Sequence, residues 1–572
     1  MAAATANDPL RAAVGARWSS RRVLLPAALV LVGVVVMCAP AEGLSMQARL
    51  AFVVFGLAIY GWVATSLNET WVAVAAALTF TLVGAEERDV FFASLGDPTI
   101  WLLLGAFVLA AAAQACGLAR RLAVVVVVRA RSVRGLFAGL TAAITLTAFV
   151  IPSTSGRAAL LVPVFLALAA AIGDKRIVRA LALLFPTVIL LSAIASLVGA
   201  GAHLVTAQIL ERTGNESLSY GRWLLLGTPF ALVSAFGSSW AIQRLFLNRE
   251  ERHRALSVTA WDLRDADDFD APSGTGPMTS SERTVLSVMT VLVALWCTES
   301  LHGIDASFVA IAGALAVTMP GLGVVGFKDA LKQVDFGILV FLAATLVLGH
   351  ALIDSGGANW LVTRPFSVIA DAPTVVIVGA VAALSLLAHL VITSRTARSS
   401  VLVPLVILLG ASAGVNPTLL AFVSTAAAGF CLTLPVSAKP VLLFSALDHA
   451  TFAPGDLLRL SRVLLPAHLV VLIVFAFTVW PALGLKAAET PAVRSSAASH
   501  AAATPPQGAS SAPTSTSAEE AARVARGHVM ERARRLEREP ERLRAAPSTR
   551  PSRPVAAPIP AAVPPTHIAV GR

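Results

Sequence analysis

Two segments of the chain place hydroxyl and arginine side chains in the same order between apolar arms. Residues 151–163 read IPSTSGRAALLVP, and residues 392–404 read ITSRTARSSVLVP. Arg157 and Arg398 stand in the same register, 241 residues apart (398 − 157 = 241). Hydroxyl and guanidinium groups both donate hydrogen bonds to oxygen, and a guanidinium group can bind an oxyanion through two bonds at once. The repeat therefore predicts two half-chains that meet around a polar, anionic solute.

The candidate substrate-binding residues come from these two segments and from two later interruptions of apolar runs. They are Ser153, Thr154, Ser155, Arg157, Ser394, Arg395, Thr396, Arg398, His203 and Lys439. His203 could respond to protons near neutral pH, or it could be a hydrogen-bonded structural histidine. Lys439 could add positive potential to the same site, or its ammonium group could extend toward the membrane surface.

Electrostatics favours an anion beside Arg157 and Arg398. Each begins the second arm of its segment, where a helix N-terminus carries partial positive charge. A charged side chain at bilayer depth also costs at least ~2.5–3.5 kcal/mol. A bound dianion would offset both terms. The alternative is that each arginine pairs with a carbonyl or carboxylate group of a neighbouring helix.

The composition indicates that lipid surrounds most of the chain. Of its 572 residues, 56% are hydrophobic and 13% charged, and the mean hydropathy is +0.77. Soluble domains carry roughly 25% charged residues. The net charge of +11 does not predict nucleic-acid binding, because the surplus lies in loops and in the tail, and arginines in short cytoplasmic loops set membrane orientation. The four cysteines lie in apolar runs without metal-ligand spacing, so we expect free thiols.

The apolar pattern predicts an all-α membrane protein with about eleven transmembrane helices and two re-entrant hairpins, since about 20 residues cross a bilayer. The expected spans are 23–39, 46–66, 70–84, 98–117, 181–210, 223–247, 284–301, 305–320, 336–353, 417–447 and 461–484, with hairpins at 135–172 and 374–413. Asp97 and Asp335 each begin a span and are expected to cap a helix. The polar hairpin tips are too short for outer loops, so they should line a cavity at membrane depth.

The distribution of charge and the number of expected membrane crossings divide the chain into five parts. These are a cytoplasmic N-terminal segment (1–22), a first membrane half (23–247), a cytoplasmic linker (248–283), a second membrane half (284–484) and a disordered tail (485–572) rich in Ala, Pro, Ser and Arg. Arginines in the expected loop 118–134 predict that it faces the cytoplasm. Five spans in each half, counted from 46–66, invert the second half, as in secondary transporters. The odd number of expected spans, counted from a cytoplasmic N-terminus, places the tail outside the cell. Residues 21–41 could alternatively form a signal peptide.

The tips Ser153–Ser155 and Ser394–Thr396, with the interruption LPVSAKP at residues 434–440, resemble the Ser-Asn-Thr and Leu-Pro motifs of the divalent anion/sodium symporter family. That family carries dicarboxylates, citrate or sulfate. The resemblance covers residues 46–484 and implies a homodimeric carrier of a small anionic solute in the cell membrane. It implies no organic cofactor.

The tips depart from the family pattern at its asparagines, which help to hold sodium and substrate. Thr154 stands in one place and Arg395 in the other. The resemblance implies possible sodium ligands at Ser153, Gly199, Thr393 and Ser437. A guanidinium group at Arg395 would repel a nearby sodium ion. The coupling ion, sodium or proton, is therefore left open.

The expected function is secondary active transport of a small divalent anion by alternating access, independent of sodium if arginines replace that ion. One alternative is a carrier of the wider ion-transporter group, moving oxyanions or exchanging cations for protons. Cation exchange would require carboxylates in the helix interruptions, which instead contain His203 and Lys439. Another alternative is an anion-selective channel with basic rings. The sequence lacks a His-Glu-x-x-His motif, and an enzyme is not expected.

Overall fold

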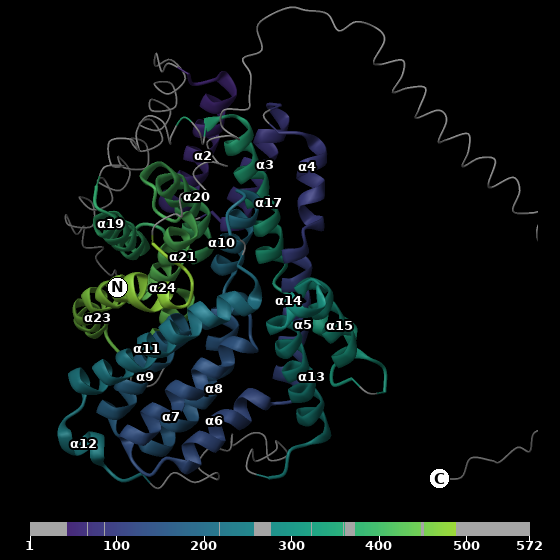
Figure 1. The fold of residues 1–572 in the computed structure, drawn as a ribbon. Helices are drawn as coiled ribbons and strands as arrows, with labels where there is room; N and C mark the ends of the chain where they lie inside the picture. The colour runs from purple at the N-terminus through teal and green to yellow at the C-terminus, as the bar shows by residue number, and fades with distance from the viewer. Residues whose placement is uncertain are drawn as a thin grey trace, which may run out of the picture. The chain divides into compact units, whose positions relative to one another are not determined.

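The computed structural model describes residues 43–487, apart from 66, 85, 217, 257–275, 322, 358–359, 361–371 and 448–450. This described part is built of helices and has no β-strand, so the prediction of an all-α protein is confirmed for it (Figure 1). Seven of its helices are long and apolar enough to cross a membrane, and shorter apolar helices accompany them. The predicted span 23–39 and nearly all of the predicted tail lie outside the described residues.

The first half of the described chain contains eleven helices. They are α2 (Met46–Ala64), α3 (Glu69–Leu82), α4 (Arg88–Ala93), α5 (Pro98–Ala115), α6 (Leu118–Arg129), α7 (Val133–Leu146), α8 (Thr154–Ile172), α9 (Lys175–Ser192), α10 (Gly201–Arg212), α11 (Tyr220–Phe246) and α12 (Arg249–His253). At many of their N-termini, a polar side chain accepts a hydrogen bond from a free backbone N–H group of the first turn. As predicted, Asp97 caps α5 by accepting from the Thr99 backbone at 2.9 Å.

The second half repeats this order of elements. Its helices are α13 (Ser280–Cys297), α14 (Glu299–His302), α15 (Ala306–Thr318), α16 (Phe327–Leu331), α17 (Phe336–Asp354), α19 (Thr374–Leu387), α20 (Arg395–Ala413), α21 (Pro417–Ala428), α22 (Lys439–Ser445), α23 (Pro454–Val474) and α24 (Trp480–Ala482). Asp335 precedes α17 and accepts from the Ile338 backbone at 3.3 Å. Its predicted capping role is therefore confirmed.

The two predicted hairpins form helix pairs with the same internal lengths. α7 and α19 have 14 residues each, and α8 and α20 have 19 each. Their first residues are 241 positions apart (374 − 133 = 241). Gly173 and Gly414 end α8 and α20 with φ of 67° and 65°, a conformation that only glycine adopts without strain. The sequence repeat is thus a structural repeat, while re-entry from one membrane side stays a prediction.

Both predicted interruptions separate a long helix from a shorter one. Two 3₁₀ turns, Ala193–Ala195 and Leu197–Gly199, divide α9 from α10, and the turn Pro435–Ser437 lies between α21 and α22. Ala200 and Ala438, which precede α10 and α22, have nearly the same extended backbone, with φ of −159° and −157°. The interruptions predicted in the runs 181–210 and 417–447 are therefore present.

The segment 118–134, predicted as a cytoplasmic loop, is mostly the helix α6. Val124 and Val127 are buried in the core, while Arg129 is exposed. A helix needs only one apolar face to pack against its neighbours. The sequence prediction gave weight to the five arginines of this segment and overlooked that apolar face. The prediction of a loop was wrong at this point.

Charged segments far apart in sequence lie close together in space, in the lower part of the view in Figure 1, near α6 and α12. Arg121 in α6 pairs with Glu282 in α13 at 3.0 Å, and Arg254 pairs with Asp174 at 2.9 Å. These contacts join the arginine-rich segments that the sequence predicts to be cytoplasmic. Their side of the membrane stays a prediction.

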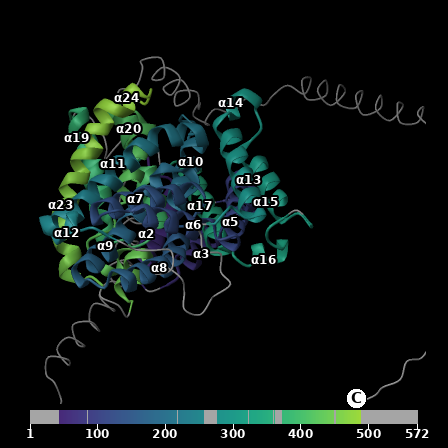
Figure 2. The same cartoon turned by 90° about the horizontal axis from the view of Figure 1, so that it is seen from below.

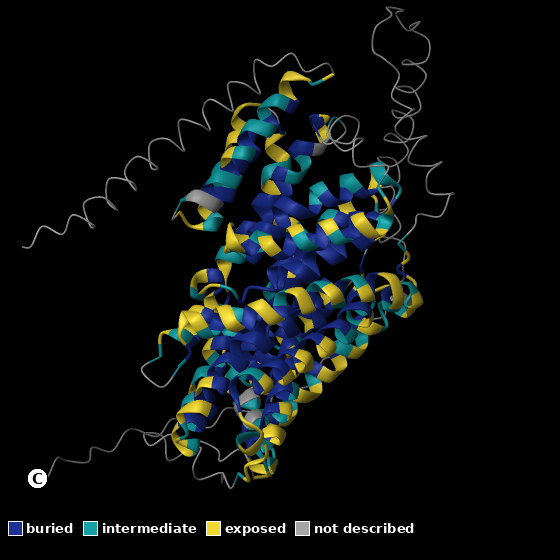
Figure 3. Cartoon of the chain, turned by 90° about the vertical axis from the view of Figure 1, so that its left-hand side faces the viewer, coloured by how far each residue is buried: buried dark blue, intermediate teal, exposed yellow. Residues whose placement is uncertain are grey.

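The most buried helices lie in the interior of the described chain, as the dark blue ribbon in Figure 3 shows. In the span Lys175–Ala195, which contains α9, 94% of the apolar window is buried, against 33% in Pro454–Ala482, which contains α23. α23 and α19 form one flank, and α13 and α15 form the opposite flank (Figure 2). The exposed apolar flanks are the surfaces that lipid would cover.

The first interruption depends on a close backbone approach at Gly199. A Cβ atom there would overlap the backbone oxygen of Ala193. We expect Gly199→Ala to lower the stability by about 1–3 kcal/mol, the usual cost of overpacking. The measurement is the melting temperature of the purified protein in detergent. Gly237→Ala in α11 is the matched control, since its Cβ would meet open space, and an equal loss in both variants would contradict this account.

Candidate functional site

The two hairpin tips and the two interruptions surround one cavity of about 420 Å³, a size typical of small-molecule sites. The starts of α3 and α17 complete its wall. Of the residues predicted from sequence, those on the wall are Ser153, Thr154, Ser155, Thr393, Ser394, Arg395, Thr396 and Lys439. Segments more than 200 residues apart are thus brought together (394 − 153 = 241).

Ser153 and Ser394 perform equivalent local tasks at the tips. The Oγ atom of Ser153 accepts from the backbone of Gly156, and that of Ser394 accepts from the backbone of Ala397, both at 3.2 Å. Each hydroxyl therefore caps its helix and retains a proton to donate. The caps direct the N-terminal ends of α8 and α20, which carry partial positive charge, toward the cavity.

Arg395 is the buried cation of the cavity wall. It is the first residue of α20, and 9% of its surface is exposed. Its Nε, Nη1 and Nη2 atoms make no hydrogen bond to any described residue. A buried charge without partners is costly, and nearly all buried polar groups in proteins are satisfied. The three nitrogen atoms also have almost no accessible surface, so a ligand in the cavity would reach their five donor hydrogens only after a movement of the side chain.

Arg157 is fully buried behind the first tip and does not lie on the cavity wall. Its guanidinium group donates to the Ile144 carbonyl at 2.8 Å and to the Ile189 carbonyl at 3.0 Å. It also donates to the hydroxyls of Thr147 and Ser192, at 2.9 and 2.7 Å. Ile144 and Ile189 lie in the last turns of α7 and α9, where carbonyls lack partners within the helix. These contacts match the structural alternative, in which Arg157 pairs with neighbouring carbonyls.

Arg398 repeats this arrangement in the second half. It is fully buried away from the cavity wall. Its Nη2 atom donates to the carbonyl of Ala428, the last residue of α21, at 3.1 Å, and contacts the Cys431 sulfur at 2.9 Å. Its Nε and Nη1 atoms have no described hydrogen-bond partner, so these contacts satisfy Arg398 less completely than Arg157. In this conformation both arginines close the C-terminal ends of helices.

The other predicted residues divide between the cavity wall and the protein interior. Lys439 is exposed on the wall. His203 is fully buried behind it, and its Nδ1 atom lies 3.0 Å from the Ser196 carbonyl. Among the predicted sodium ligands, Ser153 and Thr393 line the cavity, whereas Gly199 and Ser437 are buried in the two interruptions. The sodium sites and the homodimer stay predictions.

Two acidic residues on the wall were not singled out as site residues from the sequence. Glu69 begins α3, and Asp335 precedes α17. The Thr70 hydroxyl donates to the Gly337 carbonyl at 3.0 Å, which holds these two helix ends together. Asp335 was expected from the sequence only as a helix cap equivalent to Asp97, and Glu69, 266 residues earlier (335 − 69 = 266), gave no local signal.

One known protein family matches most of this chain. The family profile described as the sodium:sulfate symporter transmembrane region matches residues 19–486. The chain belongs to this family. The family predicted from the hairpin motifs is confirmed, and with it the expectation of a transporter instead of an enzyme. Membership also agrees with the apolar helices of a multi-pass membrane protein.

Curated relatives align with this chain over most of their length. A membrane protein of Cupriavidus necator is 23% identical over 477 residues, covering 77% of this chain and 89% of the relative. The sodium-dependent dicarboxylate transporter SdcS of Staphylococcus saprophyticus is 24% identical, covering 76% and 87%. The protein of the same name from Staphylococcus aureus is 22% identical, covering 68% and 78%.

Among solved structures, the YdaH transporter of Alcanivorax borkumensis, described as having an unusual topology, is similar to this chain. The alignment covers 77% of this chain and 98% of that protein, at 17% sequence identity and a TM-score of 0.47. A likeness at this level adds nothing to the assignment of the family.

The two kinds of buried arginine predict opposite effects on stability. Arg157→Met removes four hydrogen bonds, among them those to the carbonyls of Ile144 and Ile189. The Ile144 carbonyl keeps the Thr147 hydroxyl as a donor. We expect the substitution to cost at least about 2 kcal/mol, because bonds to charged groups are among the stronger ones. Arg395→Met removes a charge without protein partners, so the stability should be unchanged or higher.

The measurement is thermal unfolding in detergent without added anions. Arg395→Met serves as the matched control, since it makes the same substitution near the start of the equivalent hairpin helix. A larger loss of melting temperature in Arg395→Met than in Arg157→Met would contradict both assignments.

Proposed function

We propose that this transporter carries a small divalent anion, such as a dicarboxylate or sulfate, and binds it at Arg395. The observation that carries the proposal is the guanidinium group of Arg395, which is 9% exposed and has no described hydrogen-bond partner. Once this side chain turns toward the cavity, an oxyanion there would accept from it in bidentate geometry. The SdcS relatives, named as dicarboxylate transporters, support this choice of substrate class.

The remaining wall provides donors for the second charged group of a dianion. Thr154, Ser155 and Thr396 contribute hydroxyls, and the capped ends of α8 and α20 contribute free backbone N–H groups. Such helix ends bind carboxylate and sulfate oxygens. Lys439 adds a positive charge where the wall is exposed.

The wall also carries the carboxylates of Glu69 and Asp335, so its four charged residues sum to zero formal charge. Burial decides between them. Asp335 and Lys439 are exposed, so water screens their charges. Glu69 is half-buried, and one of its carboxylate oxygens is buried without a described partner. Arg395 is the most buried of the four, and a charge in a low-dielectric site acts more strongly on a ligand. The deep part of the cavity therefore favours an anion.

Transport would proceed by alternating access around this cavity, without sodium. Discontinuous helices beside a central site are typical of secondary transporters, and both interruptions border the cavity through Ala200 and Ala438. Arg395 stands where the family resemblance implies an asparagine near sodium. Its fixed positive charge would neutralise the substrate in place of that ion. Sodium-independent exchange, uniport or proton-linked transport follows from this replacement.

Binding can be tested by thermal shift with succinate, citrate and sulfate, because a ligand that binds the folded state raises the melting temperature. We expect at least one of these anions to stabilise the wild-type protein. Arg395→Met should weaken this binding by a factor of at least about 30, because truncating one member of a buried charge pair costs ~2–5 kcal/mol. Exposed Arg129→Met is the charge-matched control. Equal shifts in Arg395→Met and wild type would exclude the proposed site.

Sodium independence is tested separately by uptake into proteoliposomes. We expect the anion that binds best to enter at the same rate when choline replaces sodium, because Arg395 supplies the fixed positive charge. Saturable counterflow in the same vesicles would support a carrier and argue against a channel. Loss of all uptake in choline would contradict sodium independence while leaving the anion site intact.

A further inference from the structure

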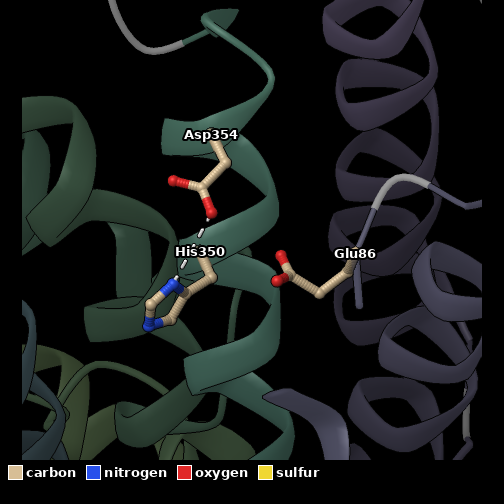
Figure 4. Close-up of side chains that lie close together, drawn as sticks. All are labelled: Glu86, His350 and Asp354. Atoms are coloured by element: carbon tan, nitrogen blue, oxygen red, sulfur yellow. Dashed lines mark ion pairs between the residues drawn. The ribbon is translucent and has the colours of Figure 1, made fainter. Parts of the chain in front are cut away.

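Three metal-ligating side chains meet outside the substrate cavity. Glu86 lies in the connection between α3 and α4, while His350 and Asp354 lie in the last turns of α17. One possible ligand atom of each residue lies within 4.8 Å of the other two. In Figure 4, the carboxylate group of Glu86 extends across the gap toward His350 and Asp354. The cluster therefore joins two separate elements of the chain.

The carboxylate of Glu86 lacks the contacts that a buried charge requires. Glu86 is 9% exposed, and its Oε2 atom has no hydrogen-bond partner among the described residues. Burial, reinforced by the charges of Asp354 and Glu87, raises the pKa of Glu86 to about 7. A buried oxygen beside a second carboxylate is satisfied by a cation placed between them, which also restores the ionised form.

We propose that Glu86, His350 and Asp354 bind a divalent transition-metal ion such as Zn²⁺. One imidazole nitrogen and two carboxylate oxygens are common zinc ligands, and imidazole favours transition metals over magnesium or calcium. A pocket of about 110 Å³ borders His350 and Asp354 and leaves room for water as a further ligand. The proposal concerns a site apart from the anion cavity and does not rest on the proposed substrate.

Arg212 at the end of α10 shows how metal binding would change the structure. Its Nη1 atom contacts Nε2 of His350, and its Nη2 atom pairs with Asp97 at 2.7 Å. Arginine only donates, so Nε2 of His350 is the acceptor and Nδ1 carries the proton. That Nδ1 atom lies 3.8 Å from Asp354, on the side of the proposed metal.

Metal binding at Nδ1 and the Arg212 contact therefore exclude each other. A metal replaces the proton on Nδ1, and the neutral ring then carries its proton on Nε2. Nε2–H cannot accept from Arg212, so this contact between α10 and α17 is lost, while Asp97 continues to hold Arg212. α10 and α17 both reach the substrate cavity, through Gly201 and Ile338. The metal thus competes with a contact between two helices that border the cavity.

The test is titration of the purified, metal-free protein with Zn²⁺, followed by calorimetry and by thermal shift. We expect saturable binding of one ion with a rise in melting temperature. Glu86→Gln and His350→Gln, on different elements, should each weaken binding at least tenfold. Glu87→Gln is the matched control, because it removes the same charge from the exposed neighbouring side chain. No binding, or binding that both site variants retain, would overturn the proposal.

Arg212→Gln provides a second test, because a purely structural cluster would not bind Zn²⁺ more tightly in this variant. Removing the competing donor should strengthen Zn²⁺ binding, whereas the site variants weaken it. Binding should also weaken from pH 7.5 to pH 5.5, because protons compete for the ligands. Unchanged affinity in Arg212→Gln would overturn the competition. Stabilisation by acid alone, with no effect of Zn²⁺, would assign the cluster to proton binding and overturn the metal site.

Discussion

Guanidinium groups removed from water require oxygen partners, and both helix pairs at the cavity are arranged around this requirement. Arg157 takes its partners from the last turns of α7 and α9, and Arg398 takes one from the end of α21. The same bonds satisfy carbonyls that helix ends leave free. The interruptions and the hairpins therefore stabilise each other. Arg395 differs from both, since it lies on the cavity wall and none of its three guanidinium nitrogens has a described hydrogen-bond partner.

The helix that carries Arg395 also joins the two apolar cores of the described chain. Early residues of α20, Ala397 and Val401, pack in the smaller core with α2, α3 and α17. Later residues, Val403 and Val406, pack in the larger core with most other helices. α17 also contributes to both, with Leu342 in the larger core and Phe341 in the smaller one. Because packed cores resist gradual deformation, movement of one core relative to the other must involve α20. The proposed anion residue lies at the start of this shared helix.

The sequence was sufficient to predict the hairpin helices and the interruptions, because each of them appears twice in the chain. In the hairpins, the capping serines and the glycines that end the second helix stand at equivalent positions. It was insufficient for contacts made by remote segments. It supplied Arg157 and Arg398 but not the carbonyls beside them, so their structural role became visible only in the fold. Glu69 reaches the cavity because distant helices place it there. α6 was missed because its arginines dominated the composition while its buried valines followed helical spacing.

The two tips differ in charge at one equivalent position, where Thr154 of the first copy corresponds to Arg395 of the second. A carrier made of two identical inverted repeats would have inward-open and outward-open forms of equal energy, by symmetry. A charge in one copy removes that degeneracy, because each form exposes this guanidinium group to water to a different extent. The empty carrier would then rest on a preferred side of the membrane. Its Michaelis constants for the two directions would differ for the same reason.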